Sequence, residues 1–318
     1  MTKSILITGG SGFLGSALVK KCLNEGWNVR VLDDNSRGSL RRLQIVMGDI
    51  EFIDGDIRNS DTVSRATQGV DTVAHLAFIN GTEFFYSKPQ LVLEVGVKGA
   101  LNTLDAALTH GVENYWLMSS SEVYQTPPMT PTDESVPLVV PDVLNPRYSY
   151  GGGKLISELL AFNYGRGRFR STVVVRPHNV YGPDMGTEHV LPQFMLRAKK
   201  LCEASSTGAI NFAIKGDGTQ TRSFVHVDDF TDGCYIAFSQ GSDMNVYHVG
   251  TLDEVTITSL AHKVVRTFGR DANIIPSEAP LGETNRRCPD ISKVSQLGYC
   301  PRIKLDDGLV SMKEWYGK

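Results

Sequence analysis

Short apolar segments alternate with amphipathic stretches over the first 175 residues of the chain. The apolar segments have the length of strands, and the stretches between them repeat apolar positions every three to four residues, as helices with one buried face do. Such alternation is typical of parallel strands joined by helical crossovers. We therefore expect strands near 4–8, 28–33, 50–54, 71–75, 114–119 and 171–177, with helices near 13–25, 60–68, 89–110 and 148–165.

The pattern becomes mixed after about residue 178, where short strands separate helices expected near 189–201, 228–239, 258–269 and 305–316. We predict a Rossmann-type, doubly wound α/β domain over residues 1–177. A smaller α/β domain that binds the substrate is predicted over residues 178–318, and interleaving of the two is left open. Residues 122–147 contain too many prolines for a helix or a central strand. They are expected to form a long loop over the strand ends, where sheets of this kind bind ligands.

A glycine-rich turn follows the first predicted strand, with Gly9, Gly12 and Gly15 leading into the first helix. Such a turn lets the backbone approach a pyrophosphate, which the N–H groups and the dipole of the helix then bind. A glycine turn without a ligand is the alternative. Asp33 ends the second strand about 20 residues further on, where a carboxylate accepts hydrogen bonds from an adenosine ribose and repels a 2′-phosphate. NAD is therefore favoured over NADP, and Arg37 is the one nearby residue that could reverse this preference.

Composition narrows the class of protein. A chain of 318 residues with 41% hydrophobic and 21% charged content can bury a large core. Its net charge of −3 argues against a nucleic-acid surface, and no apolar run approaches the roughly 18–20 residues that span a bilayer. We expect a cytoplasmic protein. Its five cysteines include no Cys-x-x-Cys pair, so reduced thiols are favoured and no metal site is expected.

The candidate catalytic residues lie at the start of the helix near 148–165. Tyr150 and Lys154 are four residues apart and therefore share one helix face. Such a pair is common by chance, but the buried strand near 114–118 delivers three serines, Ser119 to Ser121, to the same edge of the sheet. An ammonium near a tyrosine, together with the positive nicotinamide ring, favours the phenolate and lowers its pKa from about 10. Tyr150 would then take a proton from a substrate hydroxyl, while Lys154 holds the ribose of the nicotinamide.

Residues 8–15, Thr-Gly-Gly-Ser-Gly-Phe-Leu-Gly, closely resemble the extended short-chain dehydrogenase/reductase superfamily. The similarity is strongest to its nucleotide-sugar epimerase/dehydratase branch and covers nearly the whole chain. It implies NAD as cofactor, a nucleotide-diphosphate sugar as substrate, and a homodimer formed through the helices near 89–110 and 148–165. It also implies that Ser120, four residues before Tyr124, aligns the reacting oxygen.

The same resemblance assigns further residues through Gly-Asp-Ile-Arg at 55–58, His-Leu-Ala-Phe at 75–78, Arg-Pro-His-Asn-Val-Tyr-Gly-Pro at 176–183 and a glycine-rich segment at 216–229. Near the C-terminus, Arg-Cys-Pro-Asp-Ile at 287–291 completes the set. Implied cofactor contacts are Gly9, Gly12, Phe13, Leu14, Gly15, Asp33, Asp56, Ile57, Leu76, Ala77, Tyr150, Lys154 and Pro177. Implied substrate contacts are Ser121, Asn179, Arg222 and Arg287.

Two arginines are expected to bind the diphosphate, because planar guanidinium groups grip phosphate oxygens in pairs. Arg222 is one of them. Arg286 and Arg287 are neighbours that point in opposite directions in an extended chain, and Arg287 is our choice for the site.

Three positions depart from the pattern of the branch. Gly96 replaces a usual Asn, which implies that one hydrogen bond on the cofactor side is lost or made by water, and Gly153 replaces a common Ser. Gln125 replaces a glycine. The run of glycines at 151–153 costs roughly 1 kcal/mol each relative to alanine in a helix, and we interpret it as a close approach of the cofactor to the backbone.

The expected reaction begins with oxidation of the sugar at C4. The segment Ser-Ser-Glu-Val-Tyr at 120–124 resembles the Thr-Asp-Glu-Val-Tyr of related dehydratases. It keeps their Glu, as Glu122, but lacks the acidic Asp before it, so dehydration is disfavoured. A 4-epimerase needs only Ser120, Tyr150, Lys154 and NAD, and is our preferred function. Glu122 keeps a glucuronate decarboxylase, or an epimerase acting at C3 or C5, as alternatives. A non-catalytic nucleotide sensor is the alternative from another class.

Overall fold

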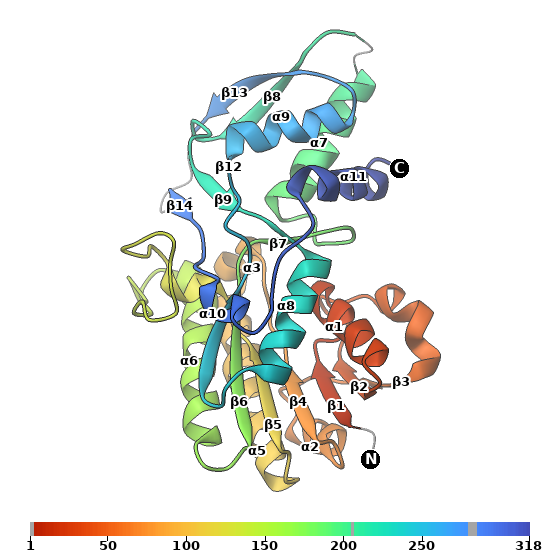
Figure 1. Cartoon of the computed structure of the whole chain (residues 1–318), viewed down its shortest axis with the longest axis vertical. Coiled ribbons are helices and arrows are strands. Elements are labelled where there is room, and N and C mark those ends of the chain that lie inside the picture. The colour runs from red at the N-terminus through yellow and green to blue at the C-terminus, as the bar shows by residue number, and fades with distance from the viewer. Residues whose placement is uncertain (1–2, 205–206, 279–284) are drawn as a thin grey trace.

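The computed structural model describes residues 3–204, 207–278 and 285–318. Its main layer is a seven-stranded sheet in the order β11-β6-β5-β4-β1-β2-β3, and every neighbouring pair is parallel (Figure 1). The six strands expected from the sequence are confirmed. They are β1 (Ser4–Thr8), β2 (Asn28–Asp33), β3 (Ile50–Asp54), β4 (Thr72–His75), β5 (Asn114–Met118) and β6 (Ser171–Pro177).

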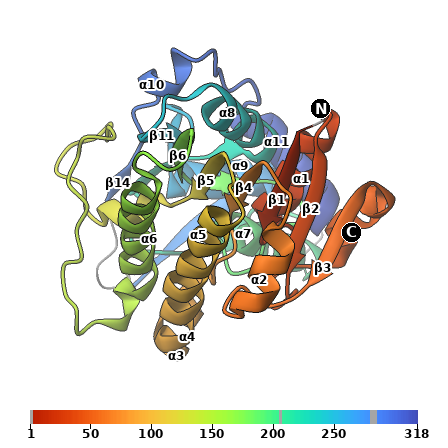
Figure 2. The ribbon, with the colours of Figure 1, turned by 90° about the horizontal axis from the view of Figure 1, so that it is seen from below.

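Helices cover both faces of this sheet (Figure 2). One face carries α1 (Phe13–Asn24) and α8 (Val227–Gln240), while α2 (Ser60–Thr67), α5 (Gly99–Thr109) and α6 (Ser149–Gly165) cover the other. Successive side chains of a strand point to opposite faces. Accordingly, Ile5 and Ile7 of β1 are buried against α1, whereas Leu6 belongs to the core under α2 and α5.

The seventh strand comes from the second half of the chain. β11 (Asn245–Val249) pairs with β6 at the edge of the sheet, with Tyr247 opposite Val175. The sheet therefore extends beyond residue 177, where we placed the end of the first domain.

A second lobe lies beyond the carboxyl ends of the strands (Figure 1). Two small sheets and three helices enclose a separate core that includes Phe212 and Leu260. The sheets are β8 (Ile210–Lys215) with β13 (Ala272–Ser277), and β12 (Glu254–Thr256), β9 (Thr221–Ser223) and β14 (Arg286–Arg287); the helices are α7 (Val190–Ala204), α9 (Ile257–Thr267) and α11 (Leu305–Tyr316). A two-stranded ladder of β7 (Val180–Tyr181) and β10 (Val225–His226) lies between the lobes.

Several elements differ from the sequence prediction. The helix expected near 89–110 consists of α4 (Pro89–Leu93), one π-helical turn η2 (Glu94–Lys98), and α5. Short helices that we did not predict are η1 (Leu40–Asp49), α3 (Thr82–Ser87), η3 (Ser121–Tyr124), η4 (Pro146–Tyr148) and α10 (Ser292–Ser295). The rest of the proline-rich segment 122–147 is irregular, as expected.

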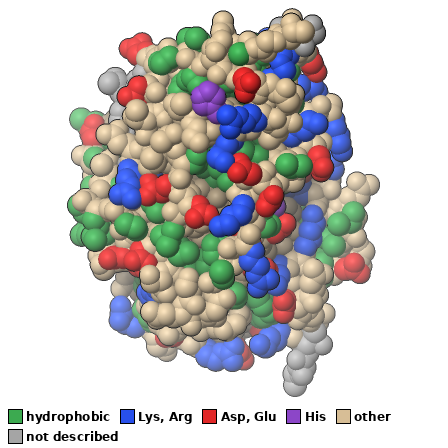
Figure 3. Space-filling model, turned by 45° about the horizontal axis from the view of Figure 1, so that its top comes forward, with side chains coloured by type: hydrophobic (Ala, Val, Ile, Leu, Met, Phe, Trp, Pro, Cys, Tyr) green, Lys and Arg blue, Asp and Glu red, His purple; other side chains and the backbone are tan. Residues whose placement is uncertain are grey.

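The surface carries mixed charges. Basic and acidic side chains are interspersed over the face drawn in Figure 3. Within the described ranges, no helix combines the length and apolar character that crossing a lipid bilayer requires. All five cysteines are free.

Candidate active site

A cavity of about 670 Å³ opens at the carboxyl ends of β1, β2, β4 and β5, against the segment that follows β7. Every residue that the sequence assigned to the site lines this cavity except Arg222. The lining residues from that set are Gly9, Gly12, Phe13, Leu14, Gly15, Asp33, Asp56, Ile57, Leu76, Ala77, Ser120, Ser121, Glu122, Tyr150, Lys154, Pro177, Asn179 and Arg287.

The glycine-rich turn at one end of the cavity fits a dinucleotide. A Cβ atom on Gly9, whose φ is +73°, would lie 2.7 Å from the backbone of Ala77, and one on Gly15 would lie 2.0 Å from the carbonyl oxygen of Gly9. Side chains are therefore excluded from the turn, and α1 begins directly after Gly12 without a side-chain cap. Its first N–H groups remain available to an anion.

Asp33 is buried beside this turn. Its carboxylate accepts hydrogen bonds from the backbone N–H groups of Ser11 and Asn35, both at 2.8 Å. These bonds fix the carboxylate at the end of β2 on the cavity wall. Asp56, at the end of β3, lies on the same wall, and the guanidinium of Arg58 holds its pKa below the usual range.

Ion pairs join the two sides of the cavity near Asp33. Arg37 pairs with Glu188 and lies over the ring of Phe84, while Arg41 and Arg42 pair with Asp184. We call these three pairs the clasp. Because Glu188 balances the charge of Arg37, this arginine is not free to favour a 2′-phosphate, in agreement with the preference for NAD.

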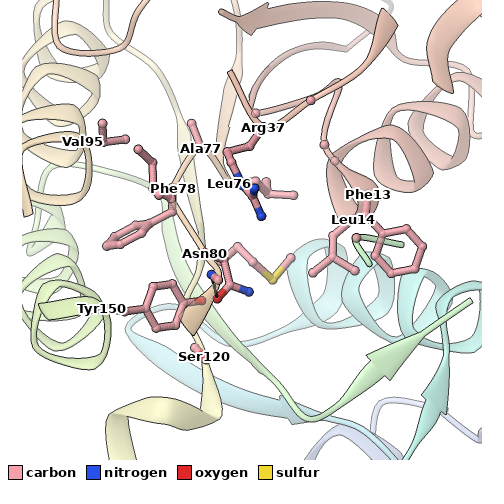
Figure 4. Close-up of a pocket in the computed structure, with 18 of the residues that line it drawn as sticks. Phe13, Leu14, Arg37, Leu76, Ala77, Phe78, Asn80, Val95, Ser120 and Tyr150 are labelled. Atoms are coloured by element: carbon pink, nitrogen blue, oxygen red, sulfur yellow. Dashed lines mark hydrogen bonds between the residues drawn. The ribbon is translucent and has the colours of Figure 1, made fainter. Parts of the chain in front are cut away.

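Ser120, Tyr150 and Lys154 converge at the other end of the cavity. β5 ends at Met118, and Ser120 caps η3 by accepting a hydrogen bond from the N–H of Glu122 at 3.1 Å. Tyr150 and Lys154 lie one turn apart in α6 and are both buried. Lys154 donates a hydrogen bond from Nζ to the carbonyl oxygen of Met118 at 2.7 Å. Figure 4 shows Ser120 and Tyr150 on the same side of the pocket.

Burial controls the protonation of this group. It raises the pKa of Tyr150 above the usual range, although a hydrogen bond with Ser120 opposes the effect. Burial also lowers the pKa of Lys154 to about 7, against the attraction of Glu158. We expected Lys154 and a bound nicotinamide ring together to lower the tyrosine pKa; in the protein without cofactor burial has the larger effect, because a buried lysine holds its charge weakly and a buried phenolate is disfavoured.

Arginines surround Glu122 beside the catalytic group. Arg287 forms an ion pair with Glu122, whereas its neighbour Arg286 turns the other way and pairs with Glu254. Arg222 is the register partner of Arg287 in the β9–β14 ladder but does not itself line the cavity. Burial alone would raise the pKa of Glu122, but Arg287, then Arg147 and Arg222, hold it below the usual range.

A buried network of polar side chains lies next to the catalytic residues, on α6 and the neighbouring strands. Arg176 of β6 pairs with Glu158 of α6, and the two side chains are only 5% and 4% exposed. Ser119 donates to Glu158, and Arg176 also donates to the hydroxyl of Tyr124. That hydroxyl lies 2.6 Å from Nε2 of His248 in β11. The network thus ties three neighbouring strands to α6.

Protein groups exclude side chains at three of the unusual glycines. A Cβ on Gly151 would lie 2.9 Å from the carbonyl oxygen of Glu122, whereas one on Gly152 would make only an ordinary contact of 3.5 Å with Val140. A Cβ on Gly96 would lie 2.2 Å from Cζ of Phe78, and one on Gly153 would lie 2.9 Å from the same atom. The space that we expected to lose a hydrogen bond or hold water is filled by the Phe78 ring.

Several lining residues were missed by the sequence analysis. Arg147 lines the cavity three residues before Tyr150, a spacing that could have identified it. Phe85 of α3 stacks on the Tyr150 ring at 5.0 Å. No local sequence motif identifies Phe85 or Glu188 as site residues, because their segments reach the cavity only in the folded protein.

The model of a family described as NAD dependent epimerase/dehydratase matches residues 5–250. The chain belongs to this family. UDP-glucuronic acid decarboxylase 3 of Arabidopsis thaliana is 33% identical over 314 residues, which cover 98% of this chain and 88% of that protein.

Solved structures also resemble this fold. DesIV, a dTDP-glucose 4,6-dehydratase of Streptomyces venezuelae with NAD and TYD bound, is 28% identical, with a TM-score of 0.86 over 99% of this chain and 97% of that one. The UDP-glucose 4-epimerase of Thermotoga maritima shares the fold at 24% identity, with a TM-score of 0.86 and coverage of 99% and 98%. As a member of this family, the present chain uses NAD as its cofactor. Nucleotide sugars are the compounds that its relatives modify.

Proposed function

We propose that the protein is a nucleotide-sugar 4-epimerase, which oxidises the sugar at C4 and returns the hydride to the opposite face. The observation that supports this proposal is the convergence of Ser120, Tyr150 and Lys154 at one end of a cavity whose other end is a dinucleotide cradle. NAD, when bound, accepts a hydride from the sugar and gives it back.

The residues of the chain have distinct tasks in this scheme. Tyr150 takes the proton from the C4 hydroxyl and returns it, and Ser120 aligns the reacting oxygen by hydrogen bonding. Lys154 holds the nicotinamide ribose and supplies a positive charge near the phenol. Phe13, Leu14, Leu76 and Ala77 line the wall between the cradle and the catalytic group, where the cofactor would lie.

The arginines next to Glu122 suit a diphosphate. Arg287 and Arg222 lie side by side in two adjacent strands, and Arg147 faces the same carboxylate. Guanidinium groups bind phosphate oxygens in pairs, so these three arginines are suited to a diphosphate. Asn179 and Ser121 line the same part of the cavity and would contact the sugar.

Glu122 bears on the choice between reactions. The position that carries an Asp acid in related dehydratases is Ser121 here, so this position offers no carboxylic acid to protonate a leaving hydroxyl at C6. Glu122 itself is held as a carboxylate by Arg287, which makes it a poor proton donor at neutral pH. Epimerisation at C4 needs neither group.

Decarboxylation of a nucleotide-linked uronic acid is the second candidate. It is favoured by Glu122, a carboxylate paired with Arg287 and two residues from Ser120, which 4-epimerisation does not need. The 33% identity to a UDP-glucuronic acid decarboxylase supports the same candidate. In that reaction the 4-ketone would promote loss of the neighbouring carboxylate as carbon dioxide.

One experiment separates these candidates. The purified protein is incubated with NAD and a panel of UDP-, dTDP-, GDP- and CDP-linked hexoses and hexuronates, and the products are followed by NMR. A C4 epimer without carbon dioxide or accumulated NADH supports the proposal. Release of carbon dioxide, or a 4-keto-6-deoxy sugar, contradicts it and identifies a lyase instead.

We also propose that the protein is a homodimer formed through the outer surfaces of α4 to α6. Leu93, Ile156 and Leu159 expose apolar side chains there, with Leu159 57% exposed. Helices α5 and α6 pack side by side and form one continuous surface. The same surface of a second copy would cover these side chains in a two-fold symmetric dimer.

A further inference from the structure

The aromatic ring of Phe78 lies directly over the Lys154 ammonium. The distance from Nζ to the ring centroid is 4.1 Å, within the range of a cation–π interaction. The same ring meets the Tyr150 ring edge to face, with centroids 5.2 Å apart and an interplanar angle of 83°. Figure 4 shows Phe78 and Tyr150 on the same side of the pocket. Phe78 thus contacts both ionisable residues of the catalytic group.

Two glycines leave the space that the Phe78 ring occupies. Phe78 packs against Gly96 in the π-helical turn and against Gly153 in α6, and any side chain at Gly96 would collide with it. A π-helical turn inserted in a helix is uncommon and is often found at a functional site. Two glycines on different helices therefore create the space that one aromatic ring fills.

The ammonium has few other partners. Within the described segments, its one hydrogen bond goes to the carbonyl oxygen of Met118. The titratable groups that face it are Tyr150 and Glu158 on its own helix and His75 at the end of β4. Glu158 is already engaged by Arg176, and burial keeps His75 neutral by lowering its pKa to about 3.

We propose that Phe78 is a positioning residue, whose ring and the Met118 carbonyl together form a seat that holds the Lys154 ammonium beside Tyr150. The ring offers its negative face to the cation from one side, and the carbonyl oxygen accepts a hydrogen bond from another. The seat stabilises the charged form of a lysine whose side chain is buried. The effect of this seat on catalysis rests on the proposed function. The contacts that form the seat do not depend on that proposal.

The test measures the titration of Lys154 directly. Protein labelled with ¹³Cε-lysine is titrated by NMR with and without NAD, and the Lys154 signal is assigned by its loss in the Lys154→Met variant. Phe78→Leu keeps an apolar side chain but removes the π face, and we expect it to lower the Lys154 pKa by about 0.5–1.5 units. Phe85→Leu is the matched control, because Phe85 stacks on Tyr150 but lies on no lysine of the site.

A second substitution covers the case in which Phe78→Leu does not fold. Replacing Phe78 by 3,5-difluorophenylalanine keeps the ring and its packing while weakening its negative face, and a smaller shift in the same direction is expected. The alkaline limb of the kcat profile should move by the same amount, with the KM for the sugar nucleotide little changed. Unchanged Lys154 titration in both proteins would overturn the proposal and leave Phe78 as packing alone. A shifted titration in a protein that converts no nucleotide sugar would instead contradict the proposed function and keep the seat.

Discussion

Lys154 illustrates the conflict between stability and function at a single residue. Its side chain is 3% exposed, and burial lowers its pKa from 10.5 to about 7. In the unfolded chain the same lysine keeps its ordinary pKa, so the folded protein binds fewer protons between about pH 7 and 10. Stability therefore rises with pH across this window.

Lys154→Met should consequently stabilise the cofactor-free protein at pH 6 and abolish most of this pH dependence. The gain is at most about 5 kcal/mol, which corresponds to the full shift, and it should shrink towards pH 10. Urea unfolding of both proteins at several pH values measures it. Equal stability of the two proteins at pH 6 would show that Lys154 carries no burial penalty.

Tyr150→Phe removes the proton-transfer group and leaves the ring. Turnover should fall by roughly 10²–10⁴-fold or more, because a positioned acid–base group contributes about that much. NAD should stay bound, since the cradle at Gly9 to Gly15 is remote from the hydroxyl. Steady-state rates and the cofactor content of the purified protein test both points. A nucleotide sensor would show no functional change in this variant.

At the scale of elements, the clasp connects η1 and the loop before it to the segment 184–188 across the cavity. These pairs are partly exposed, with side-chain exposures of 33% and 30% for Arg37 and Glu188, so each contributes no more than about 1 kcal/mol. Their placement matters more than their strength, because they close the cavity over the part that Asp33 lines.

The double variant Glu188→Gln, Asp184→Asn should release NAD about 5–30 times faster, the effect of losing roughly 1–2 kcal/mol. Raised salt should produce part of the same change in the unaltered protein. Stopped-flow fluorescence of bound NADH measures the rate. Asp253→Asn, which breaks a surface pair with Lys304 outside the cavity, is the control and should leave it unchanged. An equal effect of the control would rule out a role for the clasp.

Elements with strong local patterns were predictable from the sequence. The glycine turn, the strand ends at Asp33 and Met118, and the Tyr150–Lys154 face follow from spacing together with the strands that precede them, and the structure brings these residues to one cavity. Strand alternation predicted that only one of Arg286 and Arg287 faces the site, the resemblance to the family motif selected Arg287, and the two side chains do pair with different partners. Family resemblance supplied Asn179 and Asp56, whose positions no local rule would single out.

Features that depend on contacts between distant segments were not predictable. Two contacts arise only when separate segments meet in the folded protein. Phe78 fills the space next to Gly96, and Glu188 pairs with Arg37. The raised pKa of Tyr150 in the protein without cofactor was not predictable, because it comes from burial, which the sequence does not reveal. The π-helical turn at 94–98 has no distinct periodicity in so short a stretch.

For the whole molecule, the buried pair Glu158–Arg176 links α6 to the central strands. Glu158→Gln leaves the Arg176 charge buried without its partner and should lower the free energy of unfolding by about 3–5 kcal/mol. Chemical denaturation measures this loss. Glu51→Gln, which removes a partner of Arg30 on the exposed edge of the sheet, is the control and should cost less than about 1 kcal/mol. Similar losses in the two variants would contradict a structural role for the network.

The proposed dimer makes a prediction at the same scale. Leu159→Lys places a charge on the exposed surface of α6 and should shift the protein from dimer to monomer. Sedimentation velocity measures the change. Val310→Lys, on the equally exposed surface of α11, is the control and should leave the assembly intact. A wild-type protein that sediments as a monomer would refute the dimer.

The pairing of β11 with β6 has a consequence for how the protein is made. A nascent chain that has emerged only as far as residue 177 holds six strands but leaves one side of β6 bare, with its N–H and carbonyl groups open to any passing strand. Until residue 249 leaves the ribosome, this margin is a site for aggregation that a chaperone would have to shield. A genetic truncation near residue 177 should therefore yield inclusion bodies, not a free cofactor-binding module.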